Sequence, residues 1–334
     1  MLVQHDNVTV KQLTLNAVND SGRSGRGVHL LHVKGCNVAY CNIEAGIGVW
    51  FYGSSGNIVE NNQMDGTGYW IDTAGVELGY SENNIITGNT MQKHIYGYAA
   101  LLYFSNGNRF SGNQLIDNYR GLTLRESDNN TISDNQISVS TGVYVRPTDE
   151  VMRGSYGIQL KQSSNTSITG NSLMYCPNGV LILSNSSNNI VENNAIANSR
   201  YVGVTVAYDS NHNKITVNNL VDNGVGAKFV NSSDNLVHHN GFMNNGVVLS
   251  SHPDTEVNFF DNGIEGNFWS NYNGTDGNGD GVGDIPYIID DSNQDNYPLM
   301  NKIPEFPSWT ILPFVLTATL FSIIVRRKLC VEYL

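Results

Sequence analysis

The chain has 334 residues, with 18 Lys or Arg, 30 Asp or Glu and a formal net charge of −12 at pH 7. This acidic balance disfavours a phosphate backbone as a partner, so we expect no nucleic-acid binding. The sequence also lacks a helix-turn-helix, a P-loop and a dinucleotide-binding fingerprint, which leaves no signature of a nucleotide-dependent protein.

Residues 1–6 are not a signal peptide, because they lack a basic start and an apolar core. The next stretch, Asn7-Val-Thr-Val-Lys-Gln-Leu-Thr-Leu15, resembles the middle of the repeat described below. A solenoid that begins within a turn exposes an uncapped edge, which natural proteins avoid. We therefore expect a truncated N-terminus, with an export signal and further turns upstream.

A pair of asparagines five residues apart recurs about every 20–27 residues, a period within the range of solenoid repeats. Identical residues one turn apart form amide-to-amide ladders, and asparagine tolerates left-handed corners, so we interpret these residues as scaffold. A further copy, Thr166/Asn171, lacks its first asparagine. The complete pairs are Asn37/Asn42, Asn57/Asn62, Asn84/Asn89, Asn108/Asn113, Asn130/Asn135, Asn189/Asn194, Asn213/Asn218 and Asn235/Asn240.

A short alternating strand precedes each pair and usually opens with glycine, as in Gly121-Leu-Thr-Leu-Arg125 and Gly157-Ile-Gln-Leu-Lys161. Period-two alternation places the first and third residues after the glycine inward and the second and fourth outward. Each repeat reads as three short strands without a segment at helical spacing, unlike a leucine-rich repeat, and is too short for a propeller blade. The pattern predicts an all-β fold, a parallel β-helix of about ten turns.

Two insertions, residues 65–74 and 138–156, interrupt the repeat at the same corner and are expected to project from one side. Between them, outward strand positions combine aromatic and charged side chains. This combination suits a polysaccharide, because rings stack on sugar CH faces and cations meet carboxylates or sulfates. An ordinary solvated strand face is the alternative. The predicted ligand-binding residues are Trp50, Tyr52, Trp70, Asp72, Glu77, Tyr103, Arg125 and Lys161.

An enzymatic role has two possible forms. Glycoside hydrolysis needs two carboxylates about 5–10 Å apart, but the strand face offers only Glu77, so the partner has to come from an insertion. β-Elimination needs a base and a cation that neutralises a uronate carboxylate, and Arg125 and Lys161 lie on adjacent turns. Glu77, Arg125 and Lys161 are therefore the catalytic candidates, without a complete motif.

An Asp/Gly-rich segment, Asp276-Gly-Asn-Gly-Asp-Gly-Val-Gly-Asp284, follows the last turn. It places oxygen ligands at positions 1, 3, 5 and 9 of an EF-hand-like loop, with glycine at position 6. Tyr287 replaces the usual Glu at position 12, and Asp290 or Asp291 is a substitute. The alternative is a solvated acidic turn. We predict a structural Ca²⁺ site formed by Asp276, Asn278, Asp280, the Val282 carbonyl and Asp284.

The C-terminal run from Trp309 to Val325 is uncharged and largely apolar over 17 residues, and Arg326-Arg327-Lys328 follows at once. This length is the low end for a membrane span, and the basic stop predicts a cytoplasmic C-terminus. We expect a transmembrane helix over 309–325, a linker over 303–308 and a cytoplasmic tail over 326–334. A hydrophobic tail packed on the last turn is the alternative.

The repeats over about residues 1–267 resemble the right-handed β-helices of the NosD-type, carbohydrate-binding and sugar-hydrolysis (CASH) class. The segment Gly266–Asp284, with Asp295–Leu299 and Glu305-Phe-Pro-Ser-Trp309, is similar to the end of archaeal surface proteins of that group. The resemblance implies a right-handed helix over 1–265 and a cap over 266–302. Its namesake is linked to copper-site assembly, but His29, His32, His238 and His239 form no matching cluster.

Together these features predict an extracytoplasmic, membrane-anchored protein that binds a cell-surface or extracellular polysaccharide. A polysaccharide lyase or glycoside hydrolase, and a purely structural surface-layer or adhesion protein, are the competing interpretations.

Overall fold

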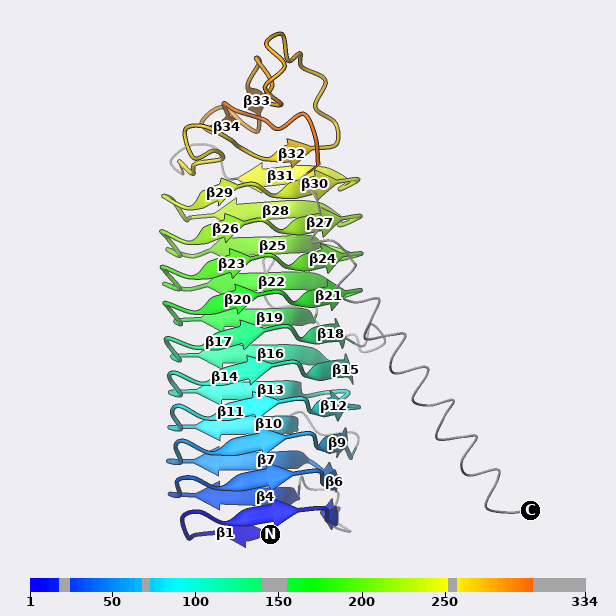
Figure 1. Cartoon of the computed structure of the whole chain (residues 1–334), viewed down its shortest axis with the longest axis vertical. Helices are drawn as coiled ribbons and strands as arrows, with labels where there is room; N and C mark the ends of the chain where they lie inside the picture. The colour runs from blue at the N-terminus through cyan, green and yellow to red at the C-terminus, as the bar shows by residue number, and fades with distance from the viewer. Residues whose placement is uncertain (18–24, 68–72, 140–154, 252–256, 303–334) are drawn as a thin grey trace, which may run out of the picture. The chain divides into compact units, whose positions relative to one another are not determined.

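The computed structural model describes residues 1–17, 25–67, 73–139, 155–251 and 257–302. Residues 1–301 form one compact unit, and the second unit, 302–334, lies outside the described residues except for Lys302. The described part of the chain contains strands, turns and bends but no helix. It coils through three parallel sheets, whose strands follow one another from β1 to β32 along the axis (Figure 1).

The first sheet carries the longest strands, most of them six residues long, and takes every third strand of the chain. Its strands are β1 (Leu2–Val3), β4 (Arg26–Leu31), β7 (Ile47–Tyr52), β10 (Ala74–Gly79), β13 (Tyr98–Tyr103), β16 (Arg120–Arg125), β19 (Tyr156–Lys161), β22 (Asn178–Leu183), β25 (Val202–Ala207), β28 (Val225–Val230) and β31 (Val247–Ser251).

The second and third sheets are built from shorter strands. The second contains β2 (Thr9–Lys11), β5 (Asn37–Ala39), β8 (Ile58–Glu60), β11 (Ile85–Thr87), β14 (Arg109–Ser111), β17 (Thr131–Ser133), β20 (Ser167–Thr169), β23 (Ile190–Glu192), β26 (Lys214–Thr216) and β29 (Leu236–His238). The third contains β3 (Thr14–Ala17), β6 (Asn42–Ala45), β9 (Gln63–Gly66), β12 (Thr90–Gln92), β15 (Gln114–Asn118), β18 (Gln136–Val139), β21 (Ser172–Met174), β24 (Ala195–Ala197), β27 (Asn219–Val221), β30 (Gly241–Met243) and β32 (Phe268–Trp269).

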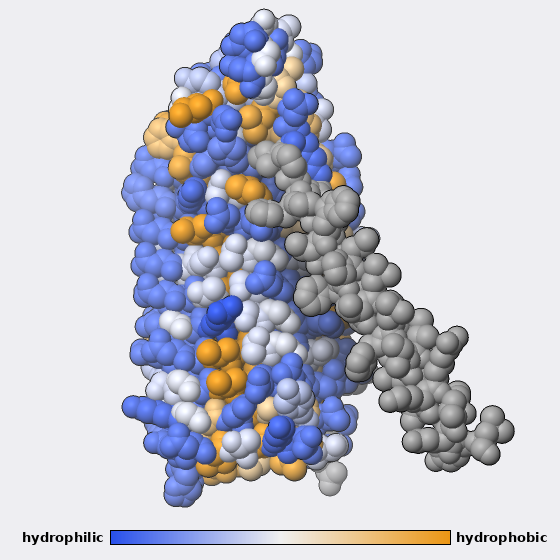
Figure 2. Space-filling view, viewed as in Figure 1, coloured by the Kyte–Doolittle hydropathy of each residue, from blue (hydrophilic) through white to orange (hydrophobic). Residues whose placement is uncertain are grey.

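Ten consecutive turns each contribute a strand to every sheet, which confirms the predicted parallel β-helix of about ten turns. The predicted alternation is seen on β13, where Ala100 and Leu102 are fully buried inside the coil, whereas Leu101 and Tyr103 are partly exposed. The handedness implied by the resemblance stays a prediction. On the face drawn in Figure 2, apolar residues form separate spots and not a continuous belt, consistent with an apolar interior and a polar exterior.

Glycine at the second position of the strands in the first sheet has a steric cause. A Cβ at Gly48 would lie 2.5 Å from the carbonyl oxygen of Gly75 and 2.9 Å from the sulfur of Met64. Successive backbones approach so closely at this corner that a side chain has no room. Most of the six-residue strands have glycine at this position, and β13 has the next smallest residue, Ala99.

Two asparagine ladders run along the interior of the coil, as predicted. In the longer one, the amide of Asn62 donates to Oδ1 of Asn89 at 3.0 Å, and Asn89 donates to Asn113 at 3.1 Å. Each Oδ1 also accepts the backbone N–H of the residue one turn before, as Asn89 does from Asn62 at 3.0 Å. Buried asparagines thus satisfy backbone donors that the tight corners leave unpaired.

The first pair is off the ladder by one residue, which corrects the sequence interpretation. Asn37 aligns with Ile58, and the ladder positions of that turn are Cys36 and Cys41, whose N–H groups donate to Asn57 and Asn62. The left-handed conformation also falls elsewhere: Asn61, with φ of 55°, precedes the ladder residue. Free, buried Cys36 and Cys41 therefore replace asparagine where the ladders begin.

A serine ladder, absent from the sequence interpretation, follows the corner after the first sheet. Each hydroxyl accepts the N–H of the serine one turn before, as Ser105 does from Ser81 at 3.0 Å. Serine is the smallest side chain that provides such an acceptor, and this corner is fully buried. The ladder consists of Ser54, Ser81, Ser105, Ser127, Ser163, Ser186, Ser210 and Ser232.

The C-terminal cap completes the longer asparagine ladder with a carboxylate. Oδ2 of Asp295 accepts the N–H of Asn267 at 2.7 Å and the indole N–H of Trp269 at 2.8 Å. Asp295 belongs to β34 (Gln294–Asp295), which pairs antiparallel with β33 (Tyr287–Ile288). The predicted boundary at 265/266 stays a prediction, since Phe268 and Trp269 still pair with the third sheet.

The predicted calcium loop lies within this cap. Asp276 accepts the N–H groups of Gly279 at 2.7 Å and Gly281 at 2.9 Å, and Asp284 accepts that of Gly277 at 2.7 Å. Within the described residues, no three His, Cys, Asp or Glu side chains are grouped to hold a metal. Calcium binding by Asp276, Asn278, Asp280, Val282 and Asp284 therefore stays a prediction.

The predicted linker, membrane span and tail (303–308, 309–325 and 326–334) lie outside the described residues. Among the residues that are described, no helix is long and apolar enough to cross a membrane. The two predicted insertions connect β9 to β10 and β18 to β19, so both join the third sheet to the first, as expected. Trp70 and Asp72, two of the predicted ligand-binding residues, lie outside the described residues.

Candidate functional site

The outward face of the first sheet holds the described residues that the sequence singled out, arranged in two columns. Trp50 and Glu77 are in register in one column. Tyr52, Tyr103, Arg125 and Lys161 belong to the other, in which Gly79 separates Tyr52 from Tyr103. The structure thus brings these six residues onto one face but places Glu77 beside the aromatic residues and one column away from the cations.

Gly79 creates the space that Tyr103 fills. A Cβ built on Gly79 would overlap the phenol ring of Tyr103, which lies one turn later on the adjacent strand. A similar arrangement lies at the corner, where the ring of His32 occupies the space beside Gly53. Both rings therefore lean along the axis over the glycine of the adjacent turn, and the glycines concentrate aromatic surface on these turns.

Seven rings form a continuous set over β4, β7, β10, β13 and the corners that follow them; we call it the aromatic tract. Trp50 stacks on His29 at 4.0 Å between ring centroids, and Tyr52 lies 5.6 Å from Tyr80. Tyr80 in turn stacks on Phe104 at 5.1 Å. The aromatic tract consists of His29, His32, Trp50, Tyr52, Tyr80, Tyr103 and Phe104.

Two rings of the tract remain largely open to solvent. Tyr80 is 52% exposed and Phe104 is 42% exposed, although both adopt the left-handed conformation, with φ of 51° and 49°. Bulky residues occur rarely at positive φ, and asparagine or glycine would adopt this conformation with less strain. Large exposed rings at strained positions are therefore more than is needed to close the turn, and they form an accessible apolar surface.

Within the aromatic tract, His29 and Tyr103 are uncharged at pH 7, whereas Arg26 places a positive charge beside Trp50. The guanidinium of Arg26 lies 3.5 Å from the ring centre of Trp50, a cation–π contact. Burial, together with the charge of Arg26, lowers the pKa of His29, so this imidazole is neutral at pH 7. Burial raises the pKa of Tyr103, which keeps its phenol protonated.

The accessible part of the face is interrupted beyond β19. On β22 and β25 the outward side chains are buried: Leu181 is 0% exposed, and Leu183 and Ala207 share an apolar cluster with Tyr156. On β28, Lys228 and Val230 are partly exposed again. The candidate site therefore covers β4 to β19 and consists of the aromatic tract, Glu77 and the cations Arg125 and Lys161.

Glu77 is the only carboxylate within the strands of the first sheet. The strands of this sheet therefore do not supply the second carboxylate that hydrolysis needs, which agrees with the sequence interpretation. Arg125 and Lys161 are in register on adjacent strands, as the elimination alternative requires. The arrangement of these residues therefore supports binding of a ligand more directly than it supports catalysis, since no complete catalytic set is present on these strands.

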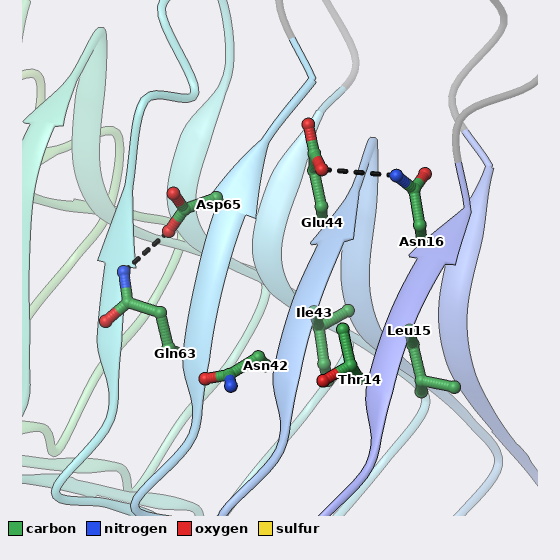
Figure 3. A pocket seen from close by; sticks show the side chains of 8 residues that line it. All are labelled: Thr14, Leu15, Asn16, Asn42, Ile43, Glu44, Gln63 and Asp65. Atoms are coloured by element: carbon green, nitrogen blue, oxygen red, sulfur yellow. Dashed lines mark hydrogen bonds between the residues drawn. The ribbon is translucent and has the colours of Figure 1, made fainter.

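A separate pocket of about 210 Å³ lies on the outward face of the third sheet, over β3, β6 and β9 (Figure 3). Glu44 and Asp65 line it in register on adjacent strands. Burial favours a raised pKa for Asp65, but hydrogen bonds from Lys93, Gln63 and Gln92 lower it overall. Asp65 is thus held ionised by its neighbours, with Lys93 at 2.9 Å. The sequence interpretation missed this pocket because column alignment across short strands was not apparent.

The family model described as "Periplasmic copper-binding protein (NosD)" matches residues 2–150 and 140–274. A search of curated proteins returns no match. The described residues do not fit a copper centre. Thiols and imidazoles are the usual copper donors, but Cys36, Cys41 and Cys176 are buried in the core, and no three His, Cys, Asp or Glu side chains in the described ranges are grouped to hold a metal.

Three solved structures are similar to this chain. A periplasmic alginate epimerase is 16% identical, with 68% of this chain and 63% of that chain covered and a TM-score of 0.47. A surface adhesin of Streptococcus pneumoniae is 11% identical, over 72% and 69%, with a TM-score of 0.57. The catalytic domain of an α-1,3-glucanase in complex with nigerose is 15% identical, over 79% and 55%, with a TM-score of 0.52. The chain spans less than two thirds of the epimerase. The adhesin and the glucanase, at identities this low, establish the fold alone.

Proposed function

This chain belongs to the NosD family, and we propose that it is an extracytoplasmic protein that binds a polysaccharide along the aromatic tract of its first sheet. The family is described as periplasmic, which supports a location outside the cytoplasm. The apolar segment 309–325 is proposed to anchor it in the membrane. The surface adhesin and the glucanase complex with a sugar are consistent with such a role for this fold.

The observation that carries the proposal is the exposed, continuous aromatic tract. Strands in a sheet are spaced by about 4.8 Å, so rings on four successive turns extend over about 14 Å along the axis. An extended sugar chain presents apolar CH faces over such a length, and aromatic side chains provide contact area at low entropic cost. Rings that only stabilised the coil would be as well served by aliphatic side chains packed against one another.

Binding without catalysis is favoured over the enzymatic alternatives. Glu77 lacks a second carboxylate within the strands of this sheet, and hydrolysis needs two. Arg125 and Lys161 remain candidates for elimination, and a lyase would release unsaturated products from uronate polymers. Absence of such products from a preparation that binds the polymer supports a binding protein.

The direct test is binding of the full chain to a glycan array, followed by affinity electrophoresis with the glycans retained. Trp50→Ala and Tyr103→Ala are expected to weaken binding by about three- to tenfold each, because aromatic contacts contribute about 0.5–1.5 kcal/mol. Tyr175→Ala is the matched control, since Tyr175 is 61% exposed but lies outside the tract. Equal loss in the control, or no retained glycan, would overturn the proposal.

We also propose that the loop 276–284 binds Ca²⁺ through side-chain oxygens of Asp276, Asn278, Asp280 and Asp284 and the carbonyl of Val282. Val282 and Gly283 are tied to the end of the cap, because Val282 bridges Leu299 and Gly283 donates to Pro298 at 2.8 Å. An ion here would therefore stabilise the cap, and it has no proposed part in binding the polysaccharide.

A further inference from the structure

We propose that Arg120, Arg125 and Lys161 form a subsite for an acidic group, a carboxylate or a sulfate ester, of the bound chain. The proposal rests on the proposed function in one respect, because it specifies that the bound polysaccharide is acidic. The geometry around Tyr98, which the sequence interpretation did not include, supports it independently.

Two guanidiniums converge on one phenol oxygen. Arg120 and Arg125 occupy the two ends of β16, and each donates to the hydroxyl oxygen of Tyr98 at 2.9 Å. Tyr98 is 7% exposed and lies in register with Arg120 on the preceding strand. A single neutral acceptor therefore holds two positive charges close together.

These cations have no counter-ion within the described residues. The ion pairs in that part of the chain join Lys93 to Asp65 and His239 to Glu265, and neither involves this cluster. Lys161 adds a third positive charge directly opposite Arg125 on the next strand. Like charges opposite each other on neighbouring strands are destabilising. In a chain of net charge −12, three neighbouring unpaired cations are well suited to an anionic ligand.

Aromatic contacts fix Arg120 in place before any ligand arrives. Its guanidinium carbon lies 4.8 Å from the ring centre of Tyr119, 4.9 Å from that of Tyr98 and 5.8 Å from that of Tyr156. Tyr156 is itself held by its hydroxyl, 3.1 Å from that of Thr123. A guanidinium fixed in this way loses little freedom on binding, and its planar fork matches a carboxylate or sulfate.

The cluster also keeps donors available. A guanidinium has five N–H groups, and the hydrogen bonds to Tyr98 use one from each arginine. The side chain of Arg125 is exposed, so its remaining N–H groups are open to a ligand, whereas Nε of Arg120 is buried without a partner. A purely structural arginine–tyrosine stack needs one guanidinium. The second guanidinium and Lys161 face the same surface as the aromatic tract and extend it by two strands.

The experiment compares acidic and neutral versions of the same polymer at low ionic strength, where charge contributes most. Full-length protein is titrated with polygalacturonate and its carboxyl-reduced form, and with dextran sulfate and dextran. The variants are Arg120→Gln, Arg125→Gln and the conservative Arg125→Lys. The control is Arg109→Gln, which removes an arginine from β14, on the second sheet. Circular dichroism establishes that each variant is folded.

We expect the wild type to prefer an acidic polymer over its neutral form by at least about tenfold, since hydrogen bonds to charged groups contribute about 1.5–3 kcal/mol. Each Gln variant is expected to lose most of that preference, because it removes a positive charge that attracts the acidic form, and Arg125→Lys is expected to be intermediate. Preference for polygalacturonate identifies a carboxylate, and preference for dextran sulfate a sulfate. Equal affinity for acidic and neutral forms, or equal loss in Arg109→Gln, overturns the subsite.

A second readout separates this inference from the proposed function. Sodium sulfate and monomeric galacturonate are expected to raise the thermal midpoint of the wild type more than that of Arg120→Gln or Arg125→Gln, because a ligand stabilises only the state that binds it. If no polymer binds but this difference persists, polysaccharide binding fails and the anion subsite stands. If neutral polymers bind and no anion effect is seen in either assay, the subsite fails and polysaccharide binding stands.

Discussion

The phenol ring of Tyr103 occupies the space that a side chain at position 79 would take, and Gly79 is what makes this possible. The two residues are in register on adjacent strands of the first sheet, and both face outward. A glycine on a regular strand normally weakens it. Here the missing side chain lets one ring lie across two turns, which links the local sequence to the accessible aromatic surface.

Gly79→Val is therefore expected to displace Tyr103 and weaken polysaccharide binding by about three- to tenfold. Overpacking is also expected to lower the free energy of unfolding by about 1–3 kcal/mol. Binding is measured by affinity electrophoresis and stability by denaturant titration. Leu101→Val, an outward change on the next strand, is the control, and equal effects of the two substitutions would contradict the assigned role of Gly79.

The ladder predicts that two asparagines that look equivalent in the sequence, Asn113 and Asn37, contribute very differently to the free energy of unfolding. Asn113 accepts the backbone N–H of Asn89 at 2.9 Å and donates to Asn135 at 3.0 Å, whereas Asn37 lies outside the ladder. Asn113→Ala leaves buried donors unpaired and is expected to cost about 3–5 kcal/mol, with about 1–3 kcal/mol for each unsatisfied group. Asn37→Ala is expected to cost less than about 1 kcal/mol.

Denaturant midpoints of the two variants, with m-values to check that each unfolds in the same manner, measure the difference. Similar midpoints for Asn37→Ala and Asn113→Ala would mean that the amide chain contributes little beyond the turn conformation of each asparagine.

The coil and its turn count were predictable because a solenoid repeats its local chemistry. Asparagine spacing, strand-opening glycines and period-two alternation all point to the same turn, and each turn contacts only its neighbours. The error at Asn37 arose because Cys36 and Cys41 replaced asparagine where the repeat was counted, while asparagines happened to follow them. Spacing alone could not distinguish a ladder residue from its neighbour.

The site was predictable in part, for a different reason. Alternation identified Trp50, Tyr103, Arg125 and Lys161 as outward, but it does not encode which outward residues align between turns of unequal length. The alignment of Gly79 with Tyr103, and the convergence of two arginines on Tyr98, depend on that register. The same holds for Glu44 and Asp65, whose alignment appears only when the short strands β6 and β9 are paired.

The buried carboxyl of Asp295 predicts a pH-dependent cap. Burial raises its pKa from 3.8 to about 6, against hydrogen bonds from Asn267, Trp269 and Tyr297 that favour the charged form. Because the folded pKa lies above the unfolded one, its stabilising contribution is complete below about pH 4 and is lost as the pH rises through 6. A shift of about two units corresponds to roughly 3 kcal/mol.

Hydrogen exchange over residues 266–302, corrected for the intrinsic pH dependence of exchange, is expected to show stronger protection at pH 5 than at pH 7.5. Asp295→Asn, which remains neutral, is expected to remove this difference while the asparagine-laddered turns stay protected. A pH effect that persists in the variant would assign it to other groups of the cap.

Removal of calcium is expected to loosen the cap and leave the coil intact. Asp276, Asp280 and Asp284 lie in one short loop, and their mutual repulsion is relieved by a bound cation. Since each solenoid turn depends on its immediate neighbours, the effect should fade within a turn or two of residue 266.

Hydrogen exchange with EDTA and with added Ca²⁺ measures this loosening of the cap. Asp280→Asn should reproduce the EDTA effect, whereas Asp234→Asn, an exposed change outside the cap, should not. Equal protection in EDTA and Ca²⁺, or no calcium by elemental analysis of the purified protein, would reduce the segment to a hydrogen-bonded acidic turn.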